Sequence, residues 1–223
     1  MRSDLKAVIF DLDGTLLNTL DDLADAVNWA LRQNNMPERT RDEVRQFVGN
    51  GVRRLMERAV PGGEHNPRFE QTFADFRHYY VNHCQDKTCL YDGISEMLTA
   101  LRAHGLQLAI VSNKLQAGVD ELYVRYFRAT VSVAVGERPP MPRKPAPDMV
   151  FTALRQLGVT ADEAVYVGDS DVDLQTAHNS GLPCIAVLWG FRDRDFLVAH
   201  GANTFAATPA EVVHLLSLPK KSY

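Results

Sequence analysis

The sequence has few cysteines and no long hydrophobic run. Its three cysteines, Cys84, Cys89 and Cys184, are odd in number and show no CxxC or histidine spacing, which argues against a disulfide framework and against a zinc site. No apolar run approaches the roughly 18 residues that a transmembrane helix requires. Asp11 interrupts the first apolar stretch, which is too short for a signal peptide. We therefore expect a cytoplasmic protein with reduced thiols and no membrane partner.

An excess of positive charge is also missing. The chain has 24 lysines and arginines against 28 aspartates and glutamates, a formal net charge of −4 and a pI of about 6.0. This balance argues against nucleic acid as the main partner. The 223 residues, of which 45% are hydrophobic and 23% charged, suffice for one domain with a smaller insert.

Short apolar runs alternate with amphipathic segments along most of the chain. The runs are rich in Val, Ile and Ala, as is typical of strands buried on both faces, and cover 6–10, 107–111, 131–135, 164–168 and 184–187. The segments between them have helical periodicity, and Gly105, Gly158 and Gly181 stand where these helices are expected to end. The alternation predicts an α/β fold, a doubly wound parallel sheet with a Rossmann-like core.

One region departs from this alternation. From about Leu20 to Thr88 the pattern is only helical. We therefore expect an inserted all-α cap domain over residues 18–89, and an α/β catalytic core formed by residues 1–17 and 90–223. The connections near 17–20 and 88–92 are expected to act as hinges. The final residues, PKKSY, are predicted to be a frayed tail.

Charged and polar residues, with two glycines, stand at or just after the ends of the predicted strands. They are Asp11, Asp13, Gly14 and Thr15 after the first, Ser112, Asn113 and Lys114 after the second, Arg143 and Lys144 well after the third, and Gly168, Asp169, Ser170, Asp171 and Asp173 after the fourth. Because open parallel sheets bind ligands beyond the carboxyl ends of their strands, we expect these groups to face one crevice. Clustered carboxylates repel one another unless a cation lies among them, and hard oxygen ligands suit Mg²⁺. Mg²⁺ in turn suits a phosphoryl group.

Four motifs give these residues a family context. "DLDGTLLNT", "VSNK", "RKPAPD" and "VGDSDVD" occur in this order, each near the end of a predicted strand or before a helix. With them the chain resembles the haloacid dehalogenase superfamily phosphatases that have an inserted helical cap, and within these the phosphoglycolate phosphatase-like group. The resemblance covers essentially the whole chain.

The resemblance implies roles for the reacting groups. Asp11 would be the nucleophile that forms an aspartyl-phosphate, and Asp13 the general acid that then becomes the base activating water. Ser112 and Lys144 would hold the phosphoryl oxygens. Asn113 is expected to shape its loop and to touch the phosphate.

The resemblance also implies a metal site. Mg²⁺ would be bound by the carboxylates of Asp11 and Asp169 and by the backbone carbonyl of Asp13. Asp173 would orient either metal-bound water or Lys144. The choice between Mg²⁺ and Mn²⁺ stays open, because both accept oxygen ligands.

The segment "FVGNGVRRLMERA", residues 47–59, is the candidate specificity element of the cap. Asn50 lies between two glycines just before a helix that carries Arg53 and Arg54. Such a helix start is a plausible site for the rest of an anionic substrate. The alternative is a plain connecting loop with both arginines in solvent, and the sequence leaves both open.

The expected function is Mg²⁺-dependent hydrolysis of a small phosphorylated metabolite, with 2-phosphoglycolate favoured by the resemblance. Pyrophosphate, a sugar phosphate and a nucleoside monophosphate remain alternative substrates. A mutase of the β-phosphoglucomutase type is less favoured, because Leu23 stands where those enzymes carry a histidine. A non-catalytic phospho-aspartate switch is disfavoured by the insert and by Asp13. A monomer and a homodimer are both compatible with the sequence.

Overall fold

The chain divides into two compact units in this computed structural model, which describes residues 5–217. Of the described residues, 5–16 and 90–217 form the unit that we call the α/β unit, and 17–89 form the helical unit. The predicted tail, PKKSY at 219–223, lies outside the described residues. No described helix combines the length and the apolar character needed to cross a membrane.

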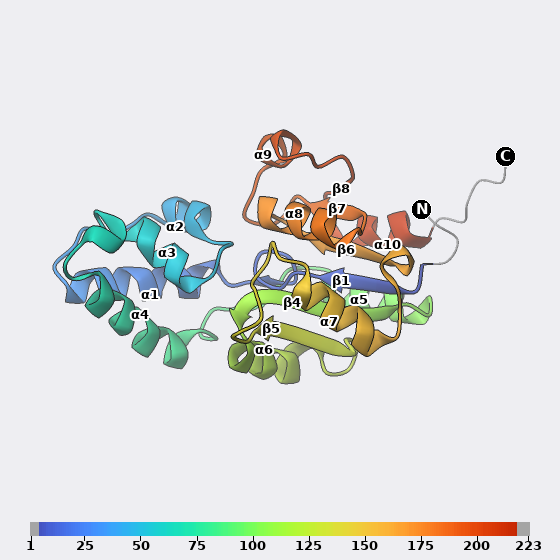
Figure 1. Cartoon of the computed structure of the whole chain (residues 1–223), viewed down its shortest axis with the longest axis horizontal. Helices are drawn as coiled ribbons and strands as arrows, with labels where there is room; N and C mark the ends of the chain where they lie inside the picture. Colours follow the sequence, from blue (N-terminus) through green and yellow to red (C-terminus); the bar gives the residue numbers. More distant parts are fainter. Residues whose placement is uncertain (1–4, 218–223) are drawn as a thin grey trace. The chain divides into compact units, whose positions relative to one another are not determined.

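A six-stranded sheet forms the centre of the α/β unit (Figure 1). Its strands, in spatial order, are β5 (Val133–Glu137), β4 (Gln107–Leu115), β1 (Ala7–Phe10), β6 (Ala164–Gly168), β7 (Cys184–Val187) and β8 (Phe205–Ala206). All neighbouring strands are parallel. The predicted doubly wound parallel fold is confirmed. The strand order reverses at β1, which lies between β4 and β6, so the ends of these three strands define the place where a ligand is expected.

Helices cover the sheet because its strands are apolar on both faces. α7 (Asp148–Leu157) and α8 (Asp171–Ser180) pack on one face, whereas α5 (Ile94–Ala103) and α10 (Pro209–Ser217) pack against each other near the opposite face (Figure 1). The remaining helical segments are α6 (Gln116–Leu122), a π-helical turn (Tyr123–Phe127), a 3-10 turn (Ala161–Glu163) and α9 (Arg194–Ala199). The core below α7 includes Ile9, Met149 and Tyr166, all fully buried.

The strand bounds of the six-stranded sheet differ from the sequence prediction in four places. β1 begins one residue later than the predicted 6–10. β4 continues to Leu115 instead of ending at 111, because its pairing with β5 shifts register after Val111 and then resumes. The polar residues of this extension resemble a loop in the sequence. β5 begins two residues later than the predicted 131–135, and β8 was not predicted because it has only two residues.

The helical unit consists of four helices, α1 (Leu20–Gln33), α2 (Arg41–Phe47), α3 (Val52–Ala59) and α4 (Phe69–His83), with a 3-10 turn (Gly63–His65). α1 packs along α4, whose aromatic residues Phe69 and Phe76 are buried between the helices. A capping box between Thr40 and Glu43 starts α2. The two segments in which the chain passes between the units pair as a short two-stranded sheet of β2 (Leu17–Asn18) and β3 (Cys89–Leu90).

Candidate active site

The loop after β1 brings the first two aspartates to the carboxyl end of the sheet. The backbone N–H of Asp11 still donates to Val167 O of β6 at 2.9 Å, so β1 pairing continues up to this residue. The chain then turns at Gly14, which has φ +89. A Cβ at Gly14 would lie 2.5 Å from Oδ2 of Asp169, so the close approach of the two strand ends requires glycine.

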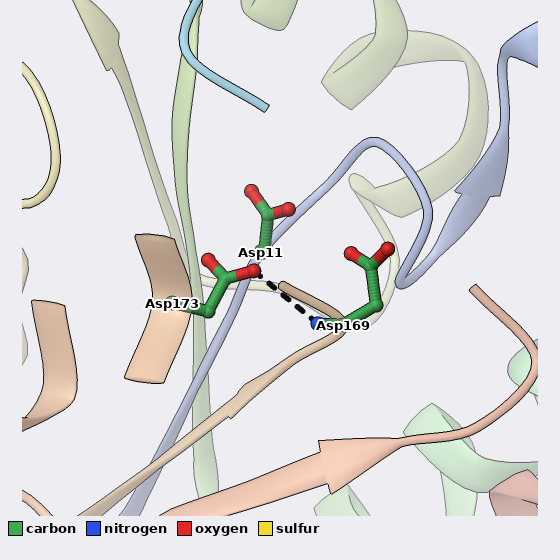
Figure 2. A group of neighbouring side chains, drawn as sticks. All are labelled: Asp11, Asp169 and Asp173. Atoms are coloured by element: carbon green, nitrogen blue, oxygen red, sulfur yellow. Dashed lines mark hydrogen bonds between the residues drawn. The ribbon is translucent and has the colours of Figure 1, made fainter. Parts of the chain in front are cut away.

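Three buried carboxylates converge at this point. Asp11, Asp169 and Asp173 each offer an oxygen, and these oxygens lie within 4.8 Å of one another (Figure 2). Burial raises the pKa of Asp11 well above its ordinary value, and the neighbouring Asp173 carboxylate adds to the effect. Burial and Asp173 likewise raise the pKa of Asp169 to about 7. Ionising these buried carboxylates together therefore costs free energy, and a bound cation would offset that cost.

Lys144 supplies one cation to this cluster. Its Nζ donates to Oδ1 of Asp11 at 2.7 Å, to Oδ1 of Asp173 at 2.9 Å and to the hydroxyl of Tyr166 at 3.0 Å. Burial by itself lowers the pKa of Lys144, but the attraction of Asp11 and Asp173 outweighs it and leaves the pKa well above its ordinary value. Lys144 is therefore charged, and its three donors are directed at fixed acceptors.

Asn113 fixes the backbone of Lys144. Its side-chain Nδ2 donates to Lys144 O at 3.1 Å, and its Oδ1 accepts from Lys144 N at 2.8 Å. This reciprocal pair ties the loop before α7 to the end of β4. Asn113 therefore helps to position Lys144. Its neighbour in the sequence, Ser112, is also buried.

Asp173 is saturated with hydrogen bonds. Its Oδ1 accepts from Lys144 and from the Tyr166 hydroxyl, the latter at 3.1 Å. Its Oδ2 accepts from Asp169 N at 3.2 Å, from Ser170 N at 3.1 Å and from Ser170 Oγ at 2.6 Å, and Figure 2 shows the first of these. These donors occupy the lone pairs that a metal would need. Of the three clustered carboxylates, Asp11 and Asp169 are thus the two suited to hold a cation.

The Asp169 carboxylate is oriented by two donors. The Thr15 hydroxyl donates to its Oδ1 at 3.1 Å, and the backbone N–H of Phe191 donates to its Oδ2 at 2.7 Å. The loop after β7 reaches this close because residue 190 is glycine, where a Cβ would lie 2.3 Å from Asp169 Cβ. The carboxylates of Asp11 and Asp169 offer oxygen donors alone, which fits Mg²⁺.

Asp13, two residues after Asp11, has one unsatisfied carboxylate oxygen. Its Oδ1 is buried and has no hydrogen-bond partner. Nζ of Lys114 lies 4.0 Å from this oxygen, which is close enough for attraction and too far for a hydrogen bond. An acid placed next to a ligand site with an unpaired oxygen is able to exchange a proton with that ligand.

The candidate cap residues have partners within the helical unit. Arg53 pairs with Glu64 at 3.2 Å and with Glu70 at 2.6 Å, and its guanidinium lies over the Phe69 ring. Arg54 pairs with Glu57 in the same way. Oδ1 of Asn50 accepts from Arg58 at 2.9 Å. Their role in substrate specificity stays a prediction. For that role each arginine has to leave its glutamate or bind the substrate and the glutamate together.

Sequence reasoning gave no role to several residues that position the cluster. They are Thr15, Tyr166, Ser170 and the backbone of Phe191. Ser170 carried a usable signal, because Ser-x-x-Asp before a helix is compatible with the capping box found there. The sequence gives no such signal for Tyr166, because it lies within an apolar strand.

Known proteins show which family this chain is similar to. The family model described as haloacid dehalogenase-like hydrolase matches residues 8–187. A phosphoglycolate phosphatase of Yersinia pseudotuberculosis is 32% identical over 219 residues, covering 96% of this chain and 94% of that protein. One of Thiobacillus denitrificans is 34% identical over 196 residues, covering 84% and 85%.

Solved structures show the same relationship. A crystal structure from Lactobacillus delbrueckii subsp. bulgaricus has a TM-score of 0.92 and 36% identity, covering 96% of this chain and 98% of that one. A structure from Haemophilus somnus has a TM-score of 0.88 and 27% identity, covering 97% and 100%. Both proteins are provisionally designated phosphoglycolate phosphatases.

Proposed function

The chain belongs to the haloacid dehalogenase-like hydrolases and is a phosphatase of the phosphoglycolate phosphatase-like group, and we propose that it hydrolyses 2-phosphoglycolate or a close analogue with Mg²⁺ through an aspartyl-phosphate at Asp11. The observation that carries this proposal is the arrangement of Asp11. Its carboxylate lies at a strand end between a fixed ammonium and a second carboxylate, as a nucleophile for phosphorus requires.

The first step transfers the phosphoryl group to the protein. A carboxylate oxygen of Asp11 attacks phosphorus, the bond between phosphorus and the ester oxygen breaks, and Asp13 gives its proton to that oxygen. The free alcohol leaves. The buried, unpaired oxygen of Asp13 supports its assignment as this acid.

The second step releases phosphate. Asp13, now ionised, takes a proton from a water molecule whose oxygen attacks the phosphorus of the aspartyl-phosphate. The bond between phosphorus and the Asp11 oxygen breaks. Asp11 regains its carboxylate and Asp13 its proton, so that one ester and one water give one alcohol and one phosphate.

The remaining residues hold the phosphoryl oxygens and the cation. Ser112, Asn113 and Lys144 would donate to the oxygens. Lys144 would use the N–H that otherwise contacts Tyr166 and keep its contacts to Asp11 and Asp173. Mg²⁺ would be held by Asp11, Asp169 and the backbone carbonyl of Asp13, and when bound it supplies positive charge between phosphate and carboxylates. The predicted cytoplasmic location stays a prediction.

Removal of divalent cations is expected to stop turnover. Asp11, Asp169 and a phosphate ester all carry negative charge, and one ammonium does not balance them. We expect steady release of p-nitrophenol from p-nitrophenyl phosphate with Mg²⁺, a loss of at least about 100-fold after chelation with EDTA, and recovery when Mg²⁺ is added back. Turnover that survives chelation would refute the metal assignment, and a single burst without turnover would refute hydrolysis.

We further propose that the helical unit acts as a cap that contributes to specificity through Asn50, Arg53 and Arg54. Replacing Arg54 with alanine removes a charge that pairs with Glu57. If Arg54 contacts substrate, KM for 2-phosphoglycolate should rise by about 10-fold and that for p-nitrophenyl phosphate by much less. Equal effects on the two substrates would exclude a role in specificity.

A further inference from the structure

The connection between α2 and α3 contains the only asparagine of the sequence that a glycine follows. Asn50 and Gly51 lie outside both helices and are half-buried, so water reaches them. Gly51 has φ +82 and no Cβ that would crowd its backbone nitrogen. Within residues 5–217 that nitrogen has no hydrogen-bond acceptor, whereas a nitrogen inside a helix would have one. The Gly51 nitrogen is therefore available to react.

The side-chain amide of Asn50 is held beside a cation. Nη2 of Arg58 donates to Oδ1 of Asn50 at 2.9 Å, and Nη1 of Arg58 donates to Phe47 O at 2.7 Å. The guanidinium is placed to stabilise negative charge that develops on the amide oxygen. A carboxylate at the same position would receive the same donor as a charge-assisted hydrogen bond. The loop therefore accommodates a carboxylate at residue 50 without a new partner.

We propose that Asn50 is a deamidation site, and that its conversion to a carboxylate weakens the binding of anionic substrates. The Gly51 nitrogen gives its proton to solvent and attacks Cγ of Asn50. A five-membered imide forms, and the side-chain nitrogen leaves as ammonia. Water then opens the imide at either carbonyl and gives aspartate or isoaspartate. The net reaction consumes one water and releases one ammonia, and nothing is oxidised or reduced.

The added charge lies next to the N-terminus of α3, because Asn50 precedes the N-cap residue Gly51. This helix end is the candidate site for the anionic part of the substrate, and its first-turn N–H groups and dipole favour negative charge. A carboxylate fixed at residue 50 competes with a substrate anion for that end and repels it. The effect on binding rests on the proposed role of Asn50 in specificity, whereas the conversion itself depends on no activity.

Peptide mapping by mass spectrometry tests the conversion. Wild-type protein is kept for several weeks in mildly alkaline buffer, and the change from amide to acid is followed at each asparagine. We expect Asn50 to convert at least about 10-fold faster than Asn179, which with Ser180 belongs to α8, where the helix fixes the backbone. The rate should rise with pH, because the attacking nitrogen has to lose its proton. Asn50→Gln should stay unconverted over the same time, because glutamine would have to close a larger ring.

Fresh and aged preparations show the effect on substrate binding. As the wild type converts, KM for 2-phosphoglycolate should rise by about 3- to 10-fold. Fresh and aged Asn50→Gln should have the same KM as each other, which excludes other effects of ageing. Fresh Asn50→Asp should show a raised KM from the start.

Each contrary result removes a different part of the inference. Conversion at Asn50 that is no faster than at Asn179 would overturn the site itself. Conversion without a change in KM would overturn its effect on binding and leave the phosphatase assignment intact. A fresh wild type that hydrolyses neither 2-phosphoglycolate nor p-nitrophenyl phosphate with Mg²⁺ would refute the proposed function, and with it the effect on binding. The mass measurement would still decide whether Asn50 converts.

Discussion

Asp11→Asn is expected to abolish turnover while preserving the fold. An amide cannot attack phosphorus, so kcat should fall by at least about 10⁴-fold, as when the nucleophile of another covalent enzyme is removed. No aspartyl-phosphate should be trapped by acid quench with labelled substrate. The variant retains the shape of the side chain, and its amide oxygen is still able to accept from Lys144.

The same variant should not be less stable than the wild type when metal is absent. Burial and Asp173 raise the pKa of Asp11, so at neutral pH its ionised form is less favourable in the folded protein than in the unfolded chain. A neutral amide removes that penalty, and the melting temperature in EDTA should stay the same or rise. A clear fall would show that the ion pair with Lys144 dominates over burial.

Asp171→Asn is the matched control for this experiment. It makes the same chemical change at the start of α8, where the side chain is 36% exposed and 3.8 Å from Arg192. We expect activity within about 3-fold of wild type, since exposed ion pairs contribute little. Residual turnover in Asp11→Asn that is comparable to this control would remove Asp11 as the nucleophile.

Most of the fold could be predicted because the strands are buried on both faces. Five apolar runs with helical segments between them predict a parallel sheet. Of the strands that precede Asp11 and Asp169, β6 has the predicted bounds and β1 begins one residue later than predicted. The end of β4 could not be predicted. Ser112 to Lys114 are polar, and they lie in the register shift between Val111 and Leu115, the residues of β4 that pair with β5 on either side of it.

The sequence predicted the charged residues of the candidate site but not the groups that orient them. Asp11 and Asp169 directly follow strands, whereas the donors that orient Asp169 come from other loops of the chain. Thr15 lies 154 residues from Asp169, and Phe191 lies 22 residues away on another loop. In the sequence Tyr166 has the pattern of a core residue. Its hydroxyl accepts a hydrogen bond from Lys144, and this contact forms only because the loop that carries Lys144 lies over the end of β6. Such contacts depend on how close the loops approach, which local patterns do not encode.

Lys144→Met is expected to cause the largest combined loss of activity and stability. Lys144 is 5% exposed and Asp173 is 1% exposed, so removal of the ammonium leaves two buried carboxylates without their cation. Breaking a buried ion pair from one side typically costs about 3–5 kcal/mol, and we expect the free energy of unfolding in EDTA to fall by this amount. Loss of a donor to the phosphoryl group should lower kcat by about 10²–10³-fold.

A double-mutant cycle distinguishes this explanation from a simple loss of packing. Asp173→Asn should cost less in the Lys144→Met background than in the wild type, because the carboxylate it removes no longer has its cation. We expect a coupling of about 1–3 kcal/mol between the two sites, measured by urea denaturation in EDTA. Lys6→Met, which breaks the exposed pair with Glu163, should cost no more than about 1 kcal/mol. Additive effects at Lys144 and Asp173 would mean that their contact contributes nothing beyond packing, and the positioning role of Asp173 would then be lost.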